Sequence, residues 1–400
     1  MAESTTLLPD KEAVFVGIGE LPAGRFPERT FMGDCIDVAL LALNDAGLKP
    51  RDVDVILLAP CLHSMEDQAD LIFSRFTEEL GVTGSVKTSL MVHSGGSTSD
   101  NLARVGSSLI RAGEAETVLV VQTDHWGHAP VEAMVDMLTF NGIAREWERP
   151  AGLSFNAIGA LLTQRYMHES GATEAEMASI CVALREWANL NENAMFRDKK
   201  LSVEKVLSTR VVADPLHSLE CPMMADGATA FVMTTLKRGR DLGRPLVRIA
   251  GSGGSVTHFS IGQERNMAVL GWPKAAAQAF EEAGWGPKDA DLAEIYDSYP
   301  VVLAVALEGI GFAPRGQAAK MFARGDFSPG GRLPVNTNGG ILSGGHIAIG
   351  GGLALLLEGV RQLMRKAPTQ RQIANCHRAI VGGTGGSYSD AQVLCLERID

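Results

Sequence analysis

The segment VALLALNDAGLKPRDVDVILL, residues 38–58, has a counterpart in AAAQAFEEAGWGPKDADLAEI, residues 275–295. Both read as an amphipathic helix, an Ala-Gly stop, a proline with a basic residue and an aspartate, and then a short apolar strand. The match from Ala46 to Val55 contains no gap. A glycine just past each helix fits the left-handed conformation that ends many helices. The pattern predicts an internal duplication.

Further matches in the same order extend this duplication. A short strand that ends in glycine precedes each copy, and after each copy a glycine-rich turn leads into an apolar helix and a further strand. The matched pairs are VFVGIGE (14–20) with VRIAGSGG (247–254), residues 93–106 with 343–352, and TVLVV (117–121) with RAIVG (378–382). Short β-branched runs are typical of buried central strands. The sequence therefore predicts an α/β protein of two βαβ-rich halves, residues 1–245 and 246–400.

Residues from about 124 to 215 have no counterpart in the second half. This stretch is polar and contains a clear helical pattern at 174–191, EAEMASICVALREWANLN. Long excursions from a repeated scaffold often form lids or substrate walls. We interpret the stretch as an insertion that caps the active site.

Composition excludes several classes of protein. With 46% hydrophobic and 21% charged residues, the 400-residue chain is ordinary for a folded globular protein. Its net charge of −11, without a Lys/Arg cluster, argues against a nucleic-acid surface. No apolar run is long enough for a membrane span, and residues 1–10 lack the layout of a secretory signal. Six scattered cysteines form neither a CxxC pair nor a disulfide framework, so we expect a reduced, cytoplasmic protein without metal or permanent cofactor.

Several motifs resemble thiolases, most closely the sterol-carrier-protein type and the thiolase-like lipid-transfer proteins. In the second half they are IYDSYPVVLAVALEGIGFA (295–313), NTNGGILSGGHIAIGGG (336–352) and GGTGG (382–386). In the first half, SGGSTSDNLARVGSSLIRAGEAETVLVV (94–121) resembles the nucleophile loop and its helix, and residues 191–198 and 214–230 also fit. The resemblance covers nearly the whole chain. It implies the thiolase fold with five layers, α-β-α-β-α, a homodimer, and an acyl-CoA substrate that carries coenzyme A with it.

The chain departs from that family at the positions that do the chemistry. The cysteine nucleophile of thiolases is expected where this chain has Gly96. The family's His-Asp-Cys-Phe motif reads Tyr296-Asp297-Ser298-Tyr299, and its Gly-His motif is retained as Gly345-His346. Because none of the six cysteines falls on a catalytic position, condensation through an acyl-cysteine is chemically unavailable. We expect Gly96 to leave room for a bulky acyl group.

The remaining residues suit cleavage of a carbon–carbon bond. A tyrosine and an alcohol both have high pKa values, so Tyr296, in place of the family histidine, is the expected acid/base. His346 is expected to polarise the thioester or relay the proton. Backbone amides around Gly96, Gly383 and Gly385 are expected to stabilise the oxyanion. These roles predict retro-aldol cleavage of a β-hydroxyacyl-CoA whose acyl group could be a steroid side chain, as in the thiolase-like steroid aldolases that the chain resembles.

Other polar residues have weaker signals. Ser97, Ser298 and His258 are candidate substrate contacts, whereas Tyr299 is expected to face the interface between the halves. His125 and His128 are three residues apart without a third ligand nearby, which is weak evidence for a metal site. We therefore predict no metal.

Two alternatives stay open. The first is an acyltransferase with an unusual nucleophile, since Ser94 and Ser97 lie in the nucleophile loop but lack an obvious base. The second is a non-catalytic subunit that binds CoA esters within a complex. The resemblance to the steroid aldolases also implies a small partner protein with an OB fold and often a zinc ribbon.

Overall fold

The order of helices and strands confirms the predicted duplication. The computed structural model describes residues 9–60, 71–348 and 351–399. The repeated elements are β1 (Ala13–Gly24), α1 (Phe31–Ala46) and β2 (Val55–Leu58) in the first half, and β8 (Leu246–Val256), α9 (Trp272–Ala283) and β9 (Leu292–Ile295) in the second. Gly47 and Gly284 end α1 and α9 with φ angles of 74° and 73°. Both glycines therefore adopt the predicted left-handed conformation.

The strands form one mixed sheet in which the two halves repeat the same order. The further matched elements are α3 (Thr98–Ala112), β4 (Thr117–His125) and β7 (Asp226–Thr235), which correspond to α13 (Gly351–Leu363), β10 (Arg378–Gly383) and β11 (Asp390–Ile399). The sheet runs β3-β2-β4-β7-β1-β8-β11-β10-β9, with β3 spanning Thr88–Met91. From β2 towards the centre, the first half contributes β2, β4, β7 and β1. From β9 towards the centre, the second half contributes their counterparts β9, β10, β11 and β8. β1 and β8 join the halves through two antiparallel residue pairs.

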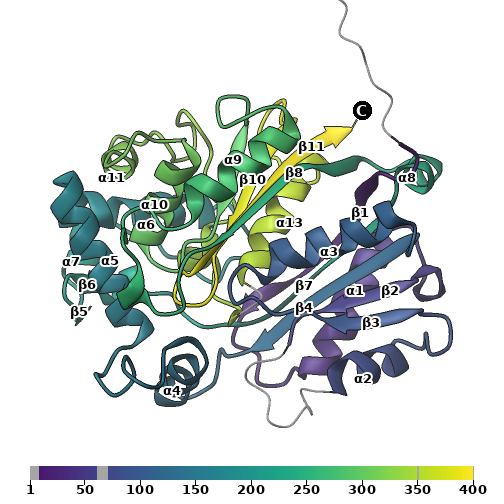
Figure 1. Ribbon diagram of the computed structural model, residues 1–400, viewed down its shortest axis with the longest axis horizontal. Helices are drawn as coiled ribbons and strands as arrows, with labels where there is room; N and C mark the ends of the chain where they lie inside the picture. The colour runs from purple at the N-terminus through teal and green to yellow at the C-terminus, as the bar shows by residue number, and fades with distance from the viewer. Residues whose placement is uncertain (1–8, 61–70, 349–350, 400) are drawn as a thin grey trace, which may run out of the picture.

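Three apolar cores hold five layers together (Figure 1), and the middle core includes the central helices. α1 and α2 (Ile72–Glu79) cover the outer face of the first half-sheet, and α9 and α10 (Pro300–Ile310) cover that of the second. α3 and α13 lie between the half-sheets, where alternate strand residues such as Phe15, Val120 and Val381 face them. Side chains on a strand alternate between its faces, so each half-sheet contributes to two cores. This arrangement gives the predicted α-β-α-β-α order.

The stretch without a counterpart in the second half is mainly helical. It contains α4 (Val131–Gly142), α5 (Phe155–Ser170), α6 (Glu174–Ala188), α7 (Val203–Leu207) and β5 (Val211–Ala213), which pairs with β6 (Leu216–His217). α6 begins at the predicted residue, where Thr173 and Glu176 form a capping box. The limits of this cap and the division of the chain at residue 245 remain predictions. Short helices α8 (Leu236–Leu242), α11 (Ala318–Ala323) and α12 (Gly340–Gly344) complete the structure.

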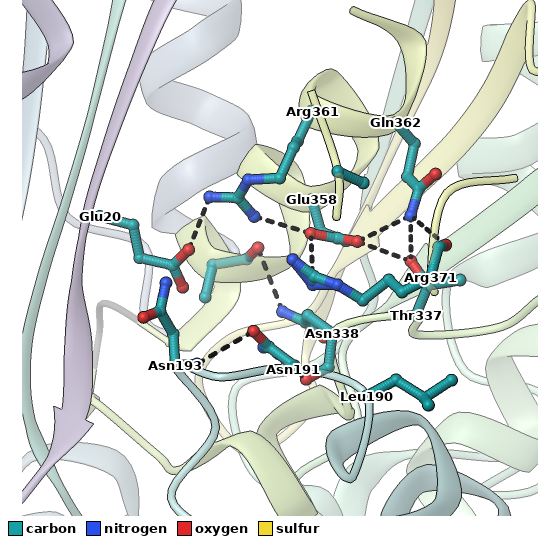
Figure 2. Close-up of polar contacts among 12 residues, drawn as sticks. Glu20, Leu190, Asn191, Asn193, Thr337, Asn338, Glu358, Arg361, Gln362 and Arg371 are labelled. Atoms are coloured by element: carbon teal, nitrogen blue, oxygen red, sulfur yellow. Dashed lines mark hydrogen bonds and ion pairs between the residues drawn. The ribbon is translucent and has the colours of Figure 1, made fainter. Parts of the chain in front are cut away.

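A buried polar network joins the two halves near the centre of the molecule. Figure 2 shows Arg361 of α13 between Glu20 of β1 and Glu358, with nitrogen–oxygen distances of 2.6 and 2.7 Å. Arg371 also faces Glu358, and Thr337 donates a 2.9 Å hydrogen bond to the same carboxylate. The two cations outweigh the effect of burial and hold the pKa of Glu358 below its usual value. The network fixes residues 336–338, which lead into α12.

Among the described residues, no helix has the length and apolar character needed to cross a membrane.

Candidate active site

A cavity of about 440 Å³ opens where the glycine-rich loops of both halves meet the cap. The first half contributes the loop before α3, and the second half contributes residues after β9, α12 and β10. Its lining residues are His93, Ser94, Gly95, Gly96, Leu138, Gly142, Phe155, Pro222, Met224, Val256, Tyr296, Ser298, Tyr299, His346, Ala348, Thr384, Gly385, Gly386, Tyr388, Ser389 and Asp390. The wall is mainly apolar with a few polar groups, as is typical of sites for small organic ligands.

Tyr296 and His346 form a pair inside this cavity. Their Oη and Nε2 atoms are 3.2 Å apart, and their rings are perpendicular. Tyr296 directly follows β9, where its backbone N–H donates to the carbonyl of Gly382. His346 follows α12, and backbone hydrogen bonds with Met223 and Ala225 hold it on both sides. The structure therefore brings together the two residues that the sequence identified as candidate catalysts.

Burial determines the protonation of this pair. It raises the pKa of Tyr296 well above its usual value, with a further contribution from the charge of Asp297. It lowers the pKa of His346 to about 4. Both side chains are consequently neutral near pH 7. The Nδ1 atom of His346 has no hydrogen-bond partner among the described residues, so Nε2 is its one anchored ring nitrogen.

The space above Gly96 is occupied by Tyr296 rather than left for substrate. A Cβ atom on Gly96 would lie 2.6 Å from both Cε2 and Cζ of Tyr296, and it would also collide with the carbonyl oxygen of Thr384. Contacts this short do not occur between real side chains, so no residue larger than glycine fits without displacing the ring. The expectation that a bulky acyl group fills this space is therefore wrong, because the phenol fills it.

Asp297 supports the loop that carries His346. Its carboxylate accepts hydrogen bonds from the backbone N–H groups of Ile341 and Leu342, at 2.8 and 3.2 Å, at the start of α12. Burial raises the pKa of Asp297 to about 7, although these two hydrogen bonds act in the opposite direction. α12 ends at Gly344, and its capping residue Gly345 immediately precedes His346. Asp297 thus connects the end of β9 with the histidine.

The two glycines of the second half do not present free amides to the cavity. The N–H of Gly385 donates to Asp390 Oδ1 at 2.5 Å, so its hydrogen points away from a bound oxyanion. Gly383 lies at the end of β10, paired with Gln392, and packs against Asp100 outside the cavity wall. The structure therefore gives no support to Gly383 and Gly385 as oxyanion donors. Gly96 and Gly386 line the cavity.

The predicted substrate contacts divide into two groups. Ser298 lines the cavity and lies with its Oγ 3.0 Å from the Oη of Tyr388. Ser97 is fully buried behind the wall, where its hydroxyl contacts the carbonyl oxygen of Ser94 and the carboxylate of Asp390, each at 2.8 Å. Because Ser97 lies outside the cavity, it cannot contact a ligand there as the loop now stands.

His258 differs from expectation, whereas Tyr299 faces residues of the first half. His258 is buried beside the cavity wall, with Nε2 3.2 Å from the carbonyl oxygen of Ser387 and Nδ1 3.1 Å from Glu264. It therefore supports the wall instead of contacting substrate. Tyr299 lines the cavity, and its hydroxyl donates to Asn156 of the cap at 2.6 Å.

The two histidines after β4 have separate carboxylate partners. His125 lies 2.8 Å from Asp34, and His128 lies 3.3 Å from Asp226. The part of the chain that the structure describes contains no group of three or more His, Cys, Asp or Glu side chains placed to hold a metal ion. Cys61 lies outside the described residues.

Three cavity residues with titratable side chains were missed by the sequence analysis. Tyr388 and Asp390 follow the GGTGG motif directly, and His93 precedes the Ser-Gly-Gly turn at the exposed rim. The one available signal for Tyr388 was its position next to a glycine-rich loop, where binding residues often lie. Its hydroxyl meets Ser298 from a segment 90 residues away, a pairing that spacing along the chain cannot reveal.

Comparison with known proteins agrees with this fold. Residues 253–398 match the family model "Thiolase C-terminal domain-like". The chain is 30% identical to 17-hydroxy-3-oxo-4-pregnene-20-carboxyl-CoA lyase of Mycobacterium tuberculosis, over 94% of this chain and 97% of that protein. It is 27% identical to an acetyl-CoA acetyltransferase of Methanothermobacter thermautotrophicus, over 94% and 98% of the two chains.

Among solved structures, the chain is similar to the Ltp2-ChsH2(DUF35) aldolase. The TM-score is 0.84 with 26% identity, and the match covers 98% of each chain. The predicted fold and family are thereby confirmed. The chain belongs to the thiolase superfamily, in the branch that includes the lipid-transfer-like proteins and the CoA-linked aldolases.

Proposed function

We propose that this protein is a carbon–carbon lyase that cleaves a β-hydroxyacyl-CoA by a retro-aldol reaction. The observation that carries the proposal is the Tyr296 ring lying over Gly96 with its hydroxyl 3.2 Å from His346. This arrangement replaces a nucleophile with an acid/base pair. The similarity to a steroid CoA lyase supports the same reaction class and a substrate with a bulky side chain.

The pair can move protons without changing the charge of the site overall. As the β-hydroxyl of the substrate gives its proton to Tyr296 Oη, the phenolic proton passes to Nε2 of neutral His346. The Cα–Cβ bond then breaks, and an aldehyde or ketone leaves. The electron pair of the broken bond forms the enolate of the acyl-CoA. The imidazolium returns its proton through Tyr296 to the α-carbon.

The rest of the cavity has matching roles. The imidazolium formed during cleavage lies close to the developing enolate, where a positive charge lowers the energy of the transition state. We assign the backbone N–H groups of Gly96 and Gly386, which line the cavity, as donors to the thioester oxygen. Ser298 and Tyr388 are suited to hold the oxygen of the departing carbonyl compound.

The direct test is product analysis with 17-hydroxy-3-oxo-4-pregnene-20-carboxyl-CoA and a short 3-hydroxy-3-methylacyl-CoA as probes. We expect a ketone and a shortened acyl-CoA in equal amounts. Tyr296→Phe and His346→Ala should each lower kcat by about 10²–10⁴-fold, the usual contribution of a general acid or base. Unchanged turnover in both variants would overturn the assignment of this pair.

An acyltransferase is the second candidate, supported by the acetyltransferase relative and by Ser94 in the cavity wall. Ser94 Oγ accepts a hydrogen bond from Asn101 and has no histidine among the contacts that the structure shows, so it lacks a base. Incubation with acetyl-CoA followed by intact mass measurement separates the candidates. A stable acetyl adduct on Ser94 would favour acyl transfer.

A partner protein and a homodimer are part of the same proposal. The similar aldolase structure is named for two components, Ltp2 and ChsH2(DUF35), which supports a second protein here, and we propose a small OB-fold protein. β3 forms one edge of the sheet and exposes Leu90, which suits pairing with a second copy. Copurification tests the partner protein, and light scattering tests the homodimer.

We also propose that the enzyme works in the cytoplasm.

A further inference from the structure

His258 bridges two loops beside the cavity. Its side chain is 1% exposed, with Nδ1 3.1 Å from Glu264 Oε2 and Nε2 3.2 Å from the carbonyl oxygen of Ser387. The Nε2–H of this imidazole can donate to the Ser387 carbonyl oxygen, and Nδ1 lies beside both Glu264 and the Thr257 hydroxyl, which is 2.8 Å away. His258 therefore connects the loop after β8 with the segment that follows the GGTGG motif.

The segment that His258 holds is anchored on both sides of Tyr388. The Ser387 hydroxyl donates to the carbonyl oxygen of Gly142 at 2.6 Å, and the backbone N–H of Thr257 donates to the carbonyl oxygen of Ser389 at 2.8 Å. Tyr388 itself has a φ of 62°, in the left-handed region that residues other than glycine rarely adopt. Such a conformation persists only where the surrounding contacts enforce it.

The strained backbone places the Tyr388 side chain in the cavity. Its hydroxyl lies 3.0 Å from Ser298 and its ring forms an edge contact with Phe155 of the cap. If the carbonyl of Ser387 were released, the backbone at Tyr388 would lose one of the contacts that enforce its left-handed conformation. The phenol would then be held less firmly beside Ser298.

We propose that His258, together with Glu264, is a positioning residue that keeps Tyr388 in its left-handed conformation and its hydroxyl in the cavity. The kinetic consequence rests on the proposed lyase function, whereas the effect on the loop does not. The sequence had suggested His258 as a substrate contact. The structure assigns it a role that acts through Tyr388.

A double-mutant cycle tests whether His258 acts through Tyr388. His258→Ala should lower kcat about tenfold in the wild-type background, and less than about twofold in a Tyr388→Phe background where the positioned hydroxyl is gone. His258→Gln places an amide N–H near the position of Nε2 and should restore kcat to within about twofold of wild type. Equal losses in both backgrounds, or no rescue by glutamine, would overturn the proposal.

Hydrogen exchange measured by mass spectrometry provides a readout that needs no turnover. Peptides covering residues 384–389 should exchange faster in His258→Ala and at the wild-type rate in His258→Gln. His217→Ala is the matched control, since His217 is also buried and contacts a backbone carbonyl oxygen, that of Thr209, elsewhere. Unchanged exchange in His258→Ala would overturn the positioning role. The expected exchange results with an inactive wild-type enzyme would instead count against the lyase function.

Discussion

At the scale of single residues, Gly96 and Tyr296 must be considered together. The phenol ring occupies the volume that a side chain at position 96 would need, so a cysteine there and a tyrosine at 296 exclude each other sterically. The absence of a side chain at position 96 is therefore coupled to the presence of the phenol at 296, the proposed acid/base. Each substitution explains the other.

Gly96→Ala tests this coupling. The added methyl group must displace the Tyr296 ring or the Thr384 carbonyl, so we expect kcat to fall at least about 100-fold and the free energy of unfolding to fall by about 1–3 kcal/mol. Turnover and urea denaturation measure the two effects. Gly286→Ala is the control, since the atoms nearest to a Cβ there are 3.8 Å away. Wild-type turnover in Gly96→Ala would contradict the steric account.

The buried histidine predicts a stability that depends on pH. The pKa of His346 falls from 6.5 to about 4 on folding, so the unfolded chain takes up a proton first as the pH decreases. The contribution of neutral His346 to stability is fully present above pH 6.5 and is lost between pH 6.5 and 4. The loss is about 1.4 kcal/mol per pH unit.

Unfolding measured against pH for wild type and His346→Gln checks this prediction. The difference in unfolding free energy between the two proteins should change over that interval and stay constant above it. A constant difference from pH 4 to 8 would mean that the histidine is not desolvated.

The sequence identified Tyr296 and His346 because both lie in motifs that can be matched to those of thiolases. It missed Tyr388 because nothing in a single sequence shows that a tyrosine after a glycine-rich loop takes up a left-handed backbone. It misplaced Ser97 and His258 because their hydrogen-bond partners, Asp390 and Ser387, are more than 100 residues away in the sequence. Contacts between distant segments depend on the assembled fold.

At the scale of elements, the cap helix α4 forms one wall of the cavity. Leu138 and Gly142 of α4, with Phe155 at the start of α5, line it. The duplicated elements were predictable because the helix and strand periods repeat in the same order. The cap was predictable as helical, but which of its faces lines a cavity follows only from how it packs.

Leu138→Trp should therefore change substrate selection. A larger side chain reduces the cavity, so we expect KM for the steroid thioester to rise at least about tenfold while KM for the short 3-hydroxy-3-methylacyl-CoA changes less than about threefold. Val131→Trp is the matched control on the same helix, because Val131 is 65% exposed and outside the cavity wall. Equal KM changes for both substrates would show that α4 does not select the acyl group.

At the scale of the whole molecule, the halves are tied together by charge as well as by apolar packing. Arg361 of the second half pairs with Glu20 of the first half and with Glu358, and all three side chains are largely buried. Removing the cation would leave Glu20 without this partner and Glu358 with Arg371 alone. The penalty for such a buried, unpaired charge exceeds the value of an exposed ion pair.

Arg361→Met should lower the free energy of unfolding by about 3–5 kcal/mol. Arg165→Met, which removes an exposed pair with Glu169, should cost less than about 1 kcal/mol. Urea denaturation of both variants measures the difference. Similar losses in the two would mean that the network does not hold the halves together.

The central claim is that the protein cleaves a carbon–carbon bond without an acyl-enzyme. The most direct measurement is turnover of the steroid thioester in D₂O without free coenzyme A, with products and intact protein analysed by mass spectrometry. The account predicts a ketone, an acyl-CoA that carries one deuterium on its α-carbon, and a protein of unchanged mass. Cleavage that requires free coenzyme A, or a protein that gains the mass of an acyl group, would contradict it.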